Sequence, residues 1–105
     1  MLILPIKKQW FDMIARGEKK AEYRAITPYY RKRFRTIGLL DENGNETGKQ
    51  ALIGLRNGYS GNAPTLTVRV LLIVDTGLPE WGAAEGELYY ALQILDIISR
   101  EGDPG

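Results

Sequence analysis

The chain of 105 residues contains no cysteine and no histidine, and these two absences exclude many kinds of site. Without cysteine there is no disulfide, no thiolate zinc site and no cysteine nucleophile. Without histidine, a Ser-His-Asp triad and imidazole metal ligands are excluded. A catalytic site in this chain would use Lys, Asp, Glu, Tyr, Ser or Thr, with pKa values shifted by burial or neighbouring charges. We expect no metal ion and no cofactor.

Long hydrophobic runs are also missing. The apolar run from Met1 to Ile6 is too short for the core of a signal peptide, and the run from Val70 to Val74 is much shorter than a membrane span. We therefore expect a soluble, cytoplasmic protein with no membrane partner. The composition, 44% hydrophobic and 26% charged, is typical of one globular domain rather than a disordered chain.

The net charge of +1 hides a strong asymmetry along the chain. Residues 7–35 contain ten Lys or Arg and three Asp or Glu, a net charge of +7, whereas residues 36–105 carry a net charge of −6. A basic segment of this kind is typical of a surface that binds phosphates. A solvated helix face balanced by acidic loops explains the charge equally well.

Hydrophobic periodicity predicts an α+β domain. An apolar stripe predicts a helix from about Lys7 to Arg16 that ends at Gly17, and Thr27-Pro28 is typical of the start of a second short helix. Strands are expected at residues 2–6, 19–24, 51–55, 66–74 and 88–94. The last segment also fits a helical period, but Gly82 and Gly86 before it and the pair Tyr89-Tyr90 at its start favour a strand. We expect five to six strands curled into a small barrel, with one domain over residues 1–98 and a flexible tail over residues 99–105.

The densest group of charged side chains lies between the first predicted helix and the following strand, at Gly17-Glu18-Lys19-Lys20-Ala21-Glu22-Tyr23-Arg24. Glu22 and Arg24 share one strand face, and Lys19 joins them if the chain is still turning there. In one interpretation the two cations donate to phosphate or carbonyl oxygens, and Glu22 accepts from an amino group such as that of cytosine. In the other, the group is an ion pair that solvates an edge strand.

A second polar group, Arg56-Asn57-Gly58-Tyr59-Ser60-Gly61, follows the strand predicted at residues 51–55. Its side chains suit hydrogen bonding or stacking on a base. Its Asn-Gly pair is equally typical of a simple hairpin turn, so both interpretations remain open. The aromatic residues Trp81, Tyr89 and Tyr90 are more typical of core than of a binding platform.

The chain resembles the activating signal cointegrator homology (ASCH) domains of the PUA-like superfamily. Gly17-x-Lys19-x-x-Glu22-x-Arg24 matches every fixed position of their G-x-K-x-x-E-x-R signature. The resemblance extends from Met1 to about Ile98 and includes Trp10-Phe11-Asp12-Met13-Ile14, Arg56-Asn57-Gly58-Tyr59, Trp81-Gly82 and Tyr89-Tyr90. It implies a small β-barrel flanked by two short N-terminal helices, with a cleft beside the signature segment.

The resemblance also implies binding of RNA or nucleotides, because members of the superfamily are generally regarded as such modules. Some ASCH proteins are amidohydrolases that act on N4-acetylcytidine, and others are proposed ribonucleases. In the amidohydrolases the signature lysine works with a threonine, and this chain has Glu22 at that position. If the chain is a hydrolase, Lys19 is its key residue and Glu22 is the second catalytic candidate.

We therefore expect recognition of RNA or of a nucleobase-containing ligand. The first alternative is hydrolysis of N4-acylated cytidine or of RNA, and the second is binding to another protein. The predicted contacts to the base and the phosphates come from Lys19, Glu22, Arg24, Arg56, Asn57, Tyr59, Ser60, Arg31, Lys32, Arg33 and Arg35.

Overall fold

The computed structural model describes residues 1–102, which form an α+β domain with two α-helices and one five-stranded mixed sheet. The elements are β1 (Ile3–Ile6), α1 (Lys8–Ala15), β2 (Ala21–Arg24), α2 (Pro28–Thr36), β3 (Gln50–Asn57), β4 (Thr65–Thr76), the 3₁₀ helix η1 (Pro79–Trp81) and β5 (Leu88–Glu101). The predicted α+β class is confirmed. Among the described residues, neither helix has the length and apolar character needed to cross a membrane.

The strand order is β1-β3-β4-β5-β2, with β1 parallel to β3 and every other pair antiparallel. The first two strands of the chain therefore lie at opposite edges of the sheet. Within residues 1–102 no strand pairing joins these edges. The sheet is open, and the closed barrel expected from the sequence is not confirmed.

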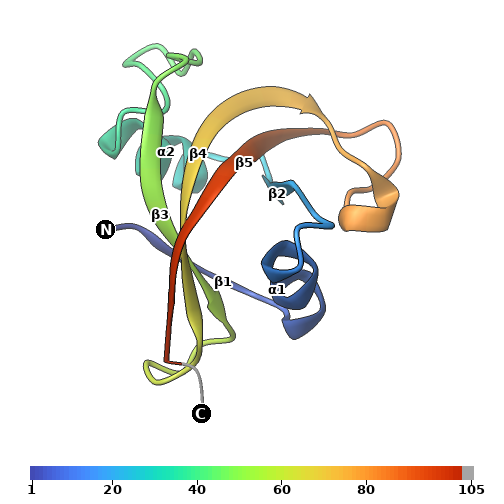
Figure 1. Ribbon diagram of the computed structural model, residues 1–105. Helices are drawn as coiled ribbons and strands as arrows, with labels where there is room; N and C mark the ends of the chain where they lie inside the picture. The colour runs from blue at the N-terminus through green and yellow to red at the C-terminus, as the bar shows by residue number, and fades with distance from the viewer. Residues whose placement is uncertain (103–105) are drawn as a thin grey trace.

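The two longest strands, β4 and β5, are strongly bent and arch over β2 and α1 (Figure 1). The pairing explains the bend, because its register shifts at two places, between Thr67 and Val68 and between Arg69 and Val70. At each place β5 carries one extra residue, Ile98 and Leu95 respectively, that has no partner on β4. Extra residues of this kind increase the local bend and twist of a strand pair.

Both helices pack on the sheet face that β4 buries through its alternating side chains. Helix α1 contributes Phe11 and Ile14 to the core, and α2 contributes Phe34. Helix α2 begins as predicted, because the Thr27 hydroxyl accepts a hydrogen bond from the backbone N–H of Tyr30 at 3.3 Å. The core also contains Leu4, Ile6, Leu39, Leu40, Ile53, Leu55, Leu66, Val68, Val70, Leu72, Tyr90 and Leu92.

The last predicted segment is a strand, as expected, but it is longer than predicted. β5 continues to Glu101, which pairs with Thr65 of β4. Residues 99–101, which were expected in a flexible tail, therefore belong to the sheet and extend the domain beyond residue 98. Residues 103–105 of the predicted tail lie outside the described residues.

Candidate functional site

The signature segment lies where α1 gives way to the edge strand β2. Gly17 has φ +81°, a conformation that glycine adopts easily, and it redirects the chain after the helix. The backbone N–H of Lys19 still donates to the carbonyl of Met13 in α1, at 3.1 Å. The chain is therefore still turning at Lys19, which brings its side chain to Glu22 as the sequence required.

Lys19 is buried, with 2% of its surface exposed. Its ammonium group donates to the carbonyl of Ala21 at 2.6 Å and to the carbonyl of Trp81 at 2.7 Å. It also lies 3.3 Å from Oε1 of Glu22. An ammonium has three N–H donors, and here each has an acceptor. Lys19 therefore joins β2, its own turn and η1.

Burial lowers the pKa of Lys19 below its ordinary value, and the Glu22 carboxylate opposes this change only in part. Aromatic rings complete the surroundings, since the ammonium lies 5.3 Å from the ring centroid of Trp10 and 4.9 Å from that of Tyr23. A general base needs a free lone pair that reaches the substrate. Lys19 is instead enclosed as a cation, and its geometry suits positioning of Glu22.

Glu22 is 7% exposed and lies between two cations. Its Oε2 accepts from Nη2 and Nε of Arg24 at 2.8 and 3.2 Å, whereas Oε1 faces Lys19. Arg24 also donates to the Tyr30 hydroxyl at 3.0 Å and to the Pro5 carbonyl at 2.9 Å. Burial by itself lowers the pKa of Arg24, but Glu22 and Tyr30 outweigh burial and leave that pKa above its ordinary value.

A cleft of about 620 Å³ opens beside these residues, and we call it the signature cleft. Its wall comes from β1, α1, β2, α2 and the end of β3, through Pro5, Ile6, Lys7, Lys8, Trp10, Glu22, Tyr23, Arg24, Ala25, Tyr30, Asn57, Gly58 and Tyr59. Glu22 and Arg24 line the cleft. Lys19 does not line it and instead contacts Glu22 from behind.

The second predicted group divides between two faces of the sheet. Asn57 and Tyr59 line the signature cleft, whereas Arg56 lines a separate hollow beside Thr65. Adjacent residues of a strand point to opposite faces, so Arg56 and Asn57 cannot both reach one cleft. Ser60 is also outside the cleft, where its hydroxyl accepts from the backbone N–H of Asn62. The segment therefore forms the turn between β3 and β4, and its residues Asn57, Gly58 and Tyr59 also form part of the cleft wall.

The predicted phosphate-binding residues of α2 also diverge. Arg33 lines hollows next to the signature cleft, whereas Arg35 lies beside Asp41 and Glu42 on another part of the surface. Arg31 lies against Gly44, whose added Cβ would stand 3.2 Å from the Arg31 Nε. Arg31, Arg33 and Arg35 therefore lie in three different parts of the surface.

Sequence reasoning missed several wall residues, among them Lys7, Lys8, Trp10 and Tyr30. Trp10 and Tyr30 are half-buried at the edge of the core. Lys7 and Lys8 directly follow the buried strand β1, and this position in the sequence could have identified them as wall residues. Within residues 1–102, no three acidic side chains gather to hold a metal ion.

Comparison of the chain with protein-family models, curated proteins and solved structures finds no match.

Proposed function

We propose that this chain is an ASCH-type module with the PUA-like fold, and that it binds RNA or another nucleobase-containing ligand in the signature cleft. The strongly bent sheet supports a barrel-like member of that fold, although its edges are not paired. The cleft supports the binding role, since Glu22 and Arg24 of the signature line it together with Asn57 and Tyr59 of the second group.

The observation that carries this proposal is the bonding state of Glu22. A carboxylate offers about four lone-pair sites. Arg24 uses two of them on Oε2 and Lys19 uses one on Oε1, which leaves one acceptor site on Oε1. Because Glu22 lines the cleft, this site suits a single N–H donor of a ligand, such as the exocyclic amine of a base.

The other cleft residues suit the remaining parts of a nucleotide. The side-chain amide of Asn57 makes no hydrogen bond to another described residue, so it is free to donate and accept at a base edge. Tyr59 is 89% exposed and offers a ring for stacking. Lys7 adds positive charge for phosphate at the cleft wall, whereas Lys8 is paired with Asp12.

Isothermal titration calorimetry of the protein with nucleoside monophosphates tests the proposal. We expect CMP and AMP, which carry an exocyclic amine, to bind more tightly than UMP, and binding to weaken as salt rises. Asn57→Ala should lower the affinity about tenfold, the effect of one lost polar contact of about 1.4 kcal/mol. Asn62→Ala, in the same hairpin loop but outside the cleft, is the matched control. Equal binding of the three nucleotides contradicts the role of Glu22.

Incubation of the protein with N4-acetylcytidine and with a short RNA separates binding from hydrolysis. Lys19 is enclosed by three acceptors, so we expect N4-acetylcytidine and a short RNA to be recovered intact after incubation. Mass spectrometry detects deacetylation and strand cleavage as different mass changes. A product that forms with wild type and is lost with Glu22→Gln would replace the binding proposal with an enzymatic one.

A further inference from the structure

The signature cleft is the first of three neighbouring hollows that share wall residues. A hollow of about 300 Å³, here the connecting hollow, shares four wall residues with the cleft: Pro5, Arg24, Tyr30 and Tyr59. It shares three others with a hollow of about 630 Å³ beside α2, here the helix hollow: Leu2, Tyr29 and Arg33. Shared wall residues place the three hollows side by side, and we call this row of hollows the β1 groove.

The β1 groove follows the N-terminal strand along its length. Leu2 lines the helix hollow and Ile6 lines the signature cleft, and the four steps between them span about 13 Å at about 3.3 Å per residue. Stacked nucleotides advance about 3.4 Å each along one strand. The groove is therefore long enough for about three to four stacked nucleotides, which is more than one mononucleotide needs.

The charge along the groove is almost entirely positive. Lys7 lies at the cleft end beside Lys8, which is paired with Asp12 outside the groove, and Lys32 and Arg33 lie at the helix end. Among the described residues, Glu22 is the one carboxylate in the wall, and its charge is already balanced by Lys19 and Arg24. Such a distribution attracts a polyanion along the whole groove rather than at one point.

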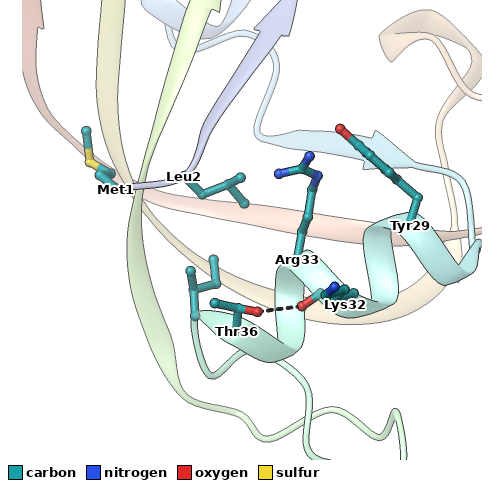
Figure 2. A pocket seen from close by; sticks show the side chains of 7 residues that line it. Met1, Leu2, Tyr29, Lys32, Arg33 and Thr36 are labelled. Carbon is teal, nitrogen blue, oxygen red and sulfur yellow. Dashed lines mark hydrogen bonds between the residues drawn. The ribbon is translucent and has the colours of Figure 1, made fainter.

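Exposed aromatic rings stand at both ends of the connecting hollow. Tyr59 is 89% exposed on the cleft side, and Tyr29 is 58% exposed on the side of the helix hollow. Figure 2 shows Tyr29 and Arg33 rising together from one face of α2, with the N-terminal residues across from them. The Arg33 guanidinium lies 4.2 Å from the Tyr29 ring centroid, so the two side chains hold each other in place.

From this row of hollows, with its positive charge and exposed rings, we propose that the β1 groove binds a single-stranded nucleic acid of about three to four nucleotides. One base enters the signature cleft, a second stacks on Tyr29, and Lys32 and Arg33 contact the phosphates beyond the cleft. Grooves that bind single strands combine a basic track with aromatic platforms in this way. The inference rests on the proposed function and adds to it a chain of nucleotides as the ligand.

The test compares strand lengths by fluorescence anisotropy competition, using CMP and cytidine oligomers of two to six nucleotides. We expect affinity to rise at least tenfold from CMP to the tetranucleotide and little beyond it. Tyr29→Ala should weaken tetranucleotide binding about 5- to 150-fold, the usual range for the loss of one stacked base. The same variant should leave CMP binding within about twofold, because Tyr29 lies outside the signature cleft.

Salt titrations test the phosphate contact. For a single strand, each neutralised phosphate contributes a slope of about −0.7 to the plot of log affinity against log salt concentration. Arg33→Ala should make the tetranucleotide slope about 0.7 less steep. Arg35→Ala removes the same charge from the same helix but lies outside the groove, and it should leave the affinity within about twofold. All the substituted side chains are exposed, so thermal unfolding should be close to wild type.

Each outcome points to one conclusion. CMP binding with no gain from a longer strand overturns the groove inference and leaves the proposed function standing, whereas failure of every nucleotide to bind overturns both. A tetraglutamate peptide that binds as tightly as the tetranucleotide, with the same loss in Arg33→Ala, identifies an acidic peptide as ligand and overturns the inference. Binding of a DNA tetranucleotide or of an RNA tetranucleotide of the same sequence supports the inference. Tighter binding of the RNA would assign contacts to the 2′-hydroxyl.

Discussion

Lys19 and Glu22 are the two buried charged residues within residues 1–102. An isolated charge is very costly to bury, so both depend on the network around them. Arg24 completes that network, and 14% of its side chain reaches solvent. Two cations and one carboxylate therefore share one site, and the carboxylate at its centre is held in a single orientation. This rigidity suits Glu22 for selecting one donor atom of a ligand.

Replacing Lys19 by methionine tests its role as the support of this site. Methionine keeps most of the length of the side chain but leaves the carbonyls of Ala21 and Trp81 without their donor. One buried and one partly buried acceptor without a donor should lower the free energy of unfolding by about 2–4 kcal/mol. Urea denaturation measures the change. Lys20→Met, at the exposed neighbouring position, should stay within about 0.5 kcal/mol, and a similar loss in both variants would contradict the role of Lys19.

The lowered pKa of Lys19 gives a pH dependence with a definite sign. In the unfolded chain the lysine titrates near its ordinary value of 10.5, and burial places the folded value below that. Between the two values the unfolded state binds more protons, so stability rises with pH across this alkaline window. We expect wild type to gain stability relative to Lys19→Met as pH increases through the window. Urea unfolding at several pH values measures this, and a constant difference would contradict it.

At the scale of elements, η1 lies far from β2 in the sequence yet completes the site. Trp81 supplies the carbonyl that accepts from Lys19, and Gly82 ends η1 with φ +102°. A Cβ at Gly82 would stand 3.0 Å from Cζ2 of Trp10, which lines the signature cleft. The turn therefore connects the buried ammonium to the cleft wall through contacts with two tryptophans.

Gly82→Ala should disturb both parts of this connection. The left-handed backbone costs an L-residue about 1–2 kcal/mol, and the added methyl group also pushes on Trp10. Gly86→Ala is the matched control, because Gly86 has φ +75° but nothing within 4 Å of its added Cβ. We expect both variants to lose stability, and only Gly82→Ala to lose affinity for CMP. Equal affinity in the two variants would show that Trp10 does not shape the cleft.

Local patterns predict the elements well because each rests on nearby residues. The Thr27 cap, the turn at Gly17 and the alternation in β4 are all visible in short windows of sequence. The bulges at Leu95 and Ile98 are not visible, because leucine and isoleucine are common at ordinary paired strand positions as well. The enclosure of Lys19 was also hidden, since its acceptor at Trp81 lies 62 residues away. The signature predicted that Lys19, Glu22 and Arg24 lie together, but not that Lys19 stays outside the cleft wall while the other two line it.

At the scale of the whole molecule, the strand order separates β1 and β2 although they are close in sequence. The bend of β4 and β5 brings these two edges to one cleft, where Arg24 of β2 donates to the Pro5 carbonyl of β1. The same guanidinium contacts Tyr30 of α2. One side chain thus links three elements across the open side of the sheet, where strand pairing does not.

Arg24→Lys should weaken this link while keeping the charge. A lysine ammonium lacks the planar fork that reaches Glu22, Tyr30 and Pro5 together, so at least one of these contacts is lost. Loss of one hydrogen bond to a charged group should lower the free energy of unfolding by about 1.5–3 kcal/mol. Amide exchange at β1 should become faster than in wild type, because its edge is released. Arg69→Lys, in the exposed pair with Asp96 across β4 and β5, should change stability by no more than about 1 kcal/mol. Unchanged exchange at β1 in Arg24→Lys would mean that core packing alone holds the two edges together.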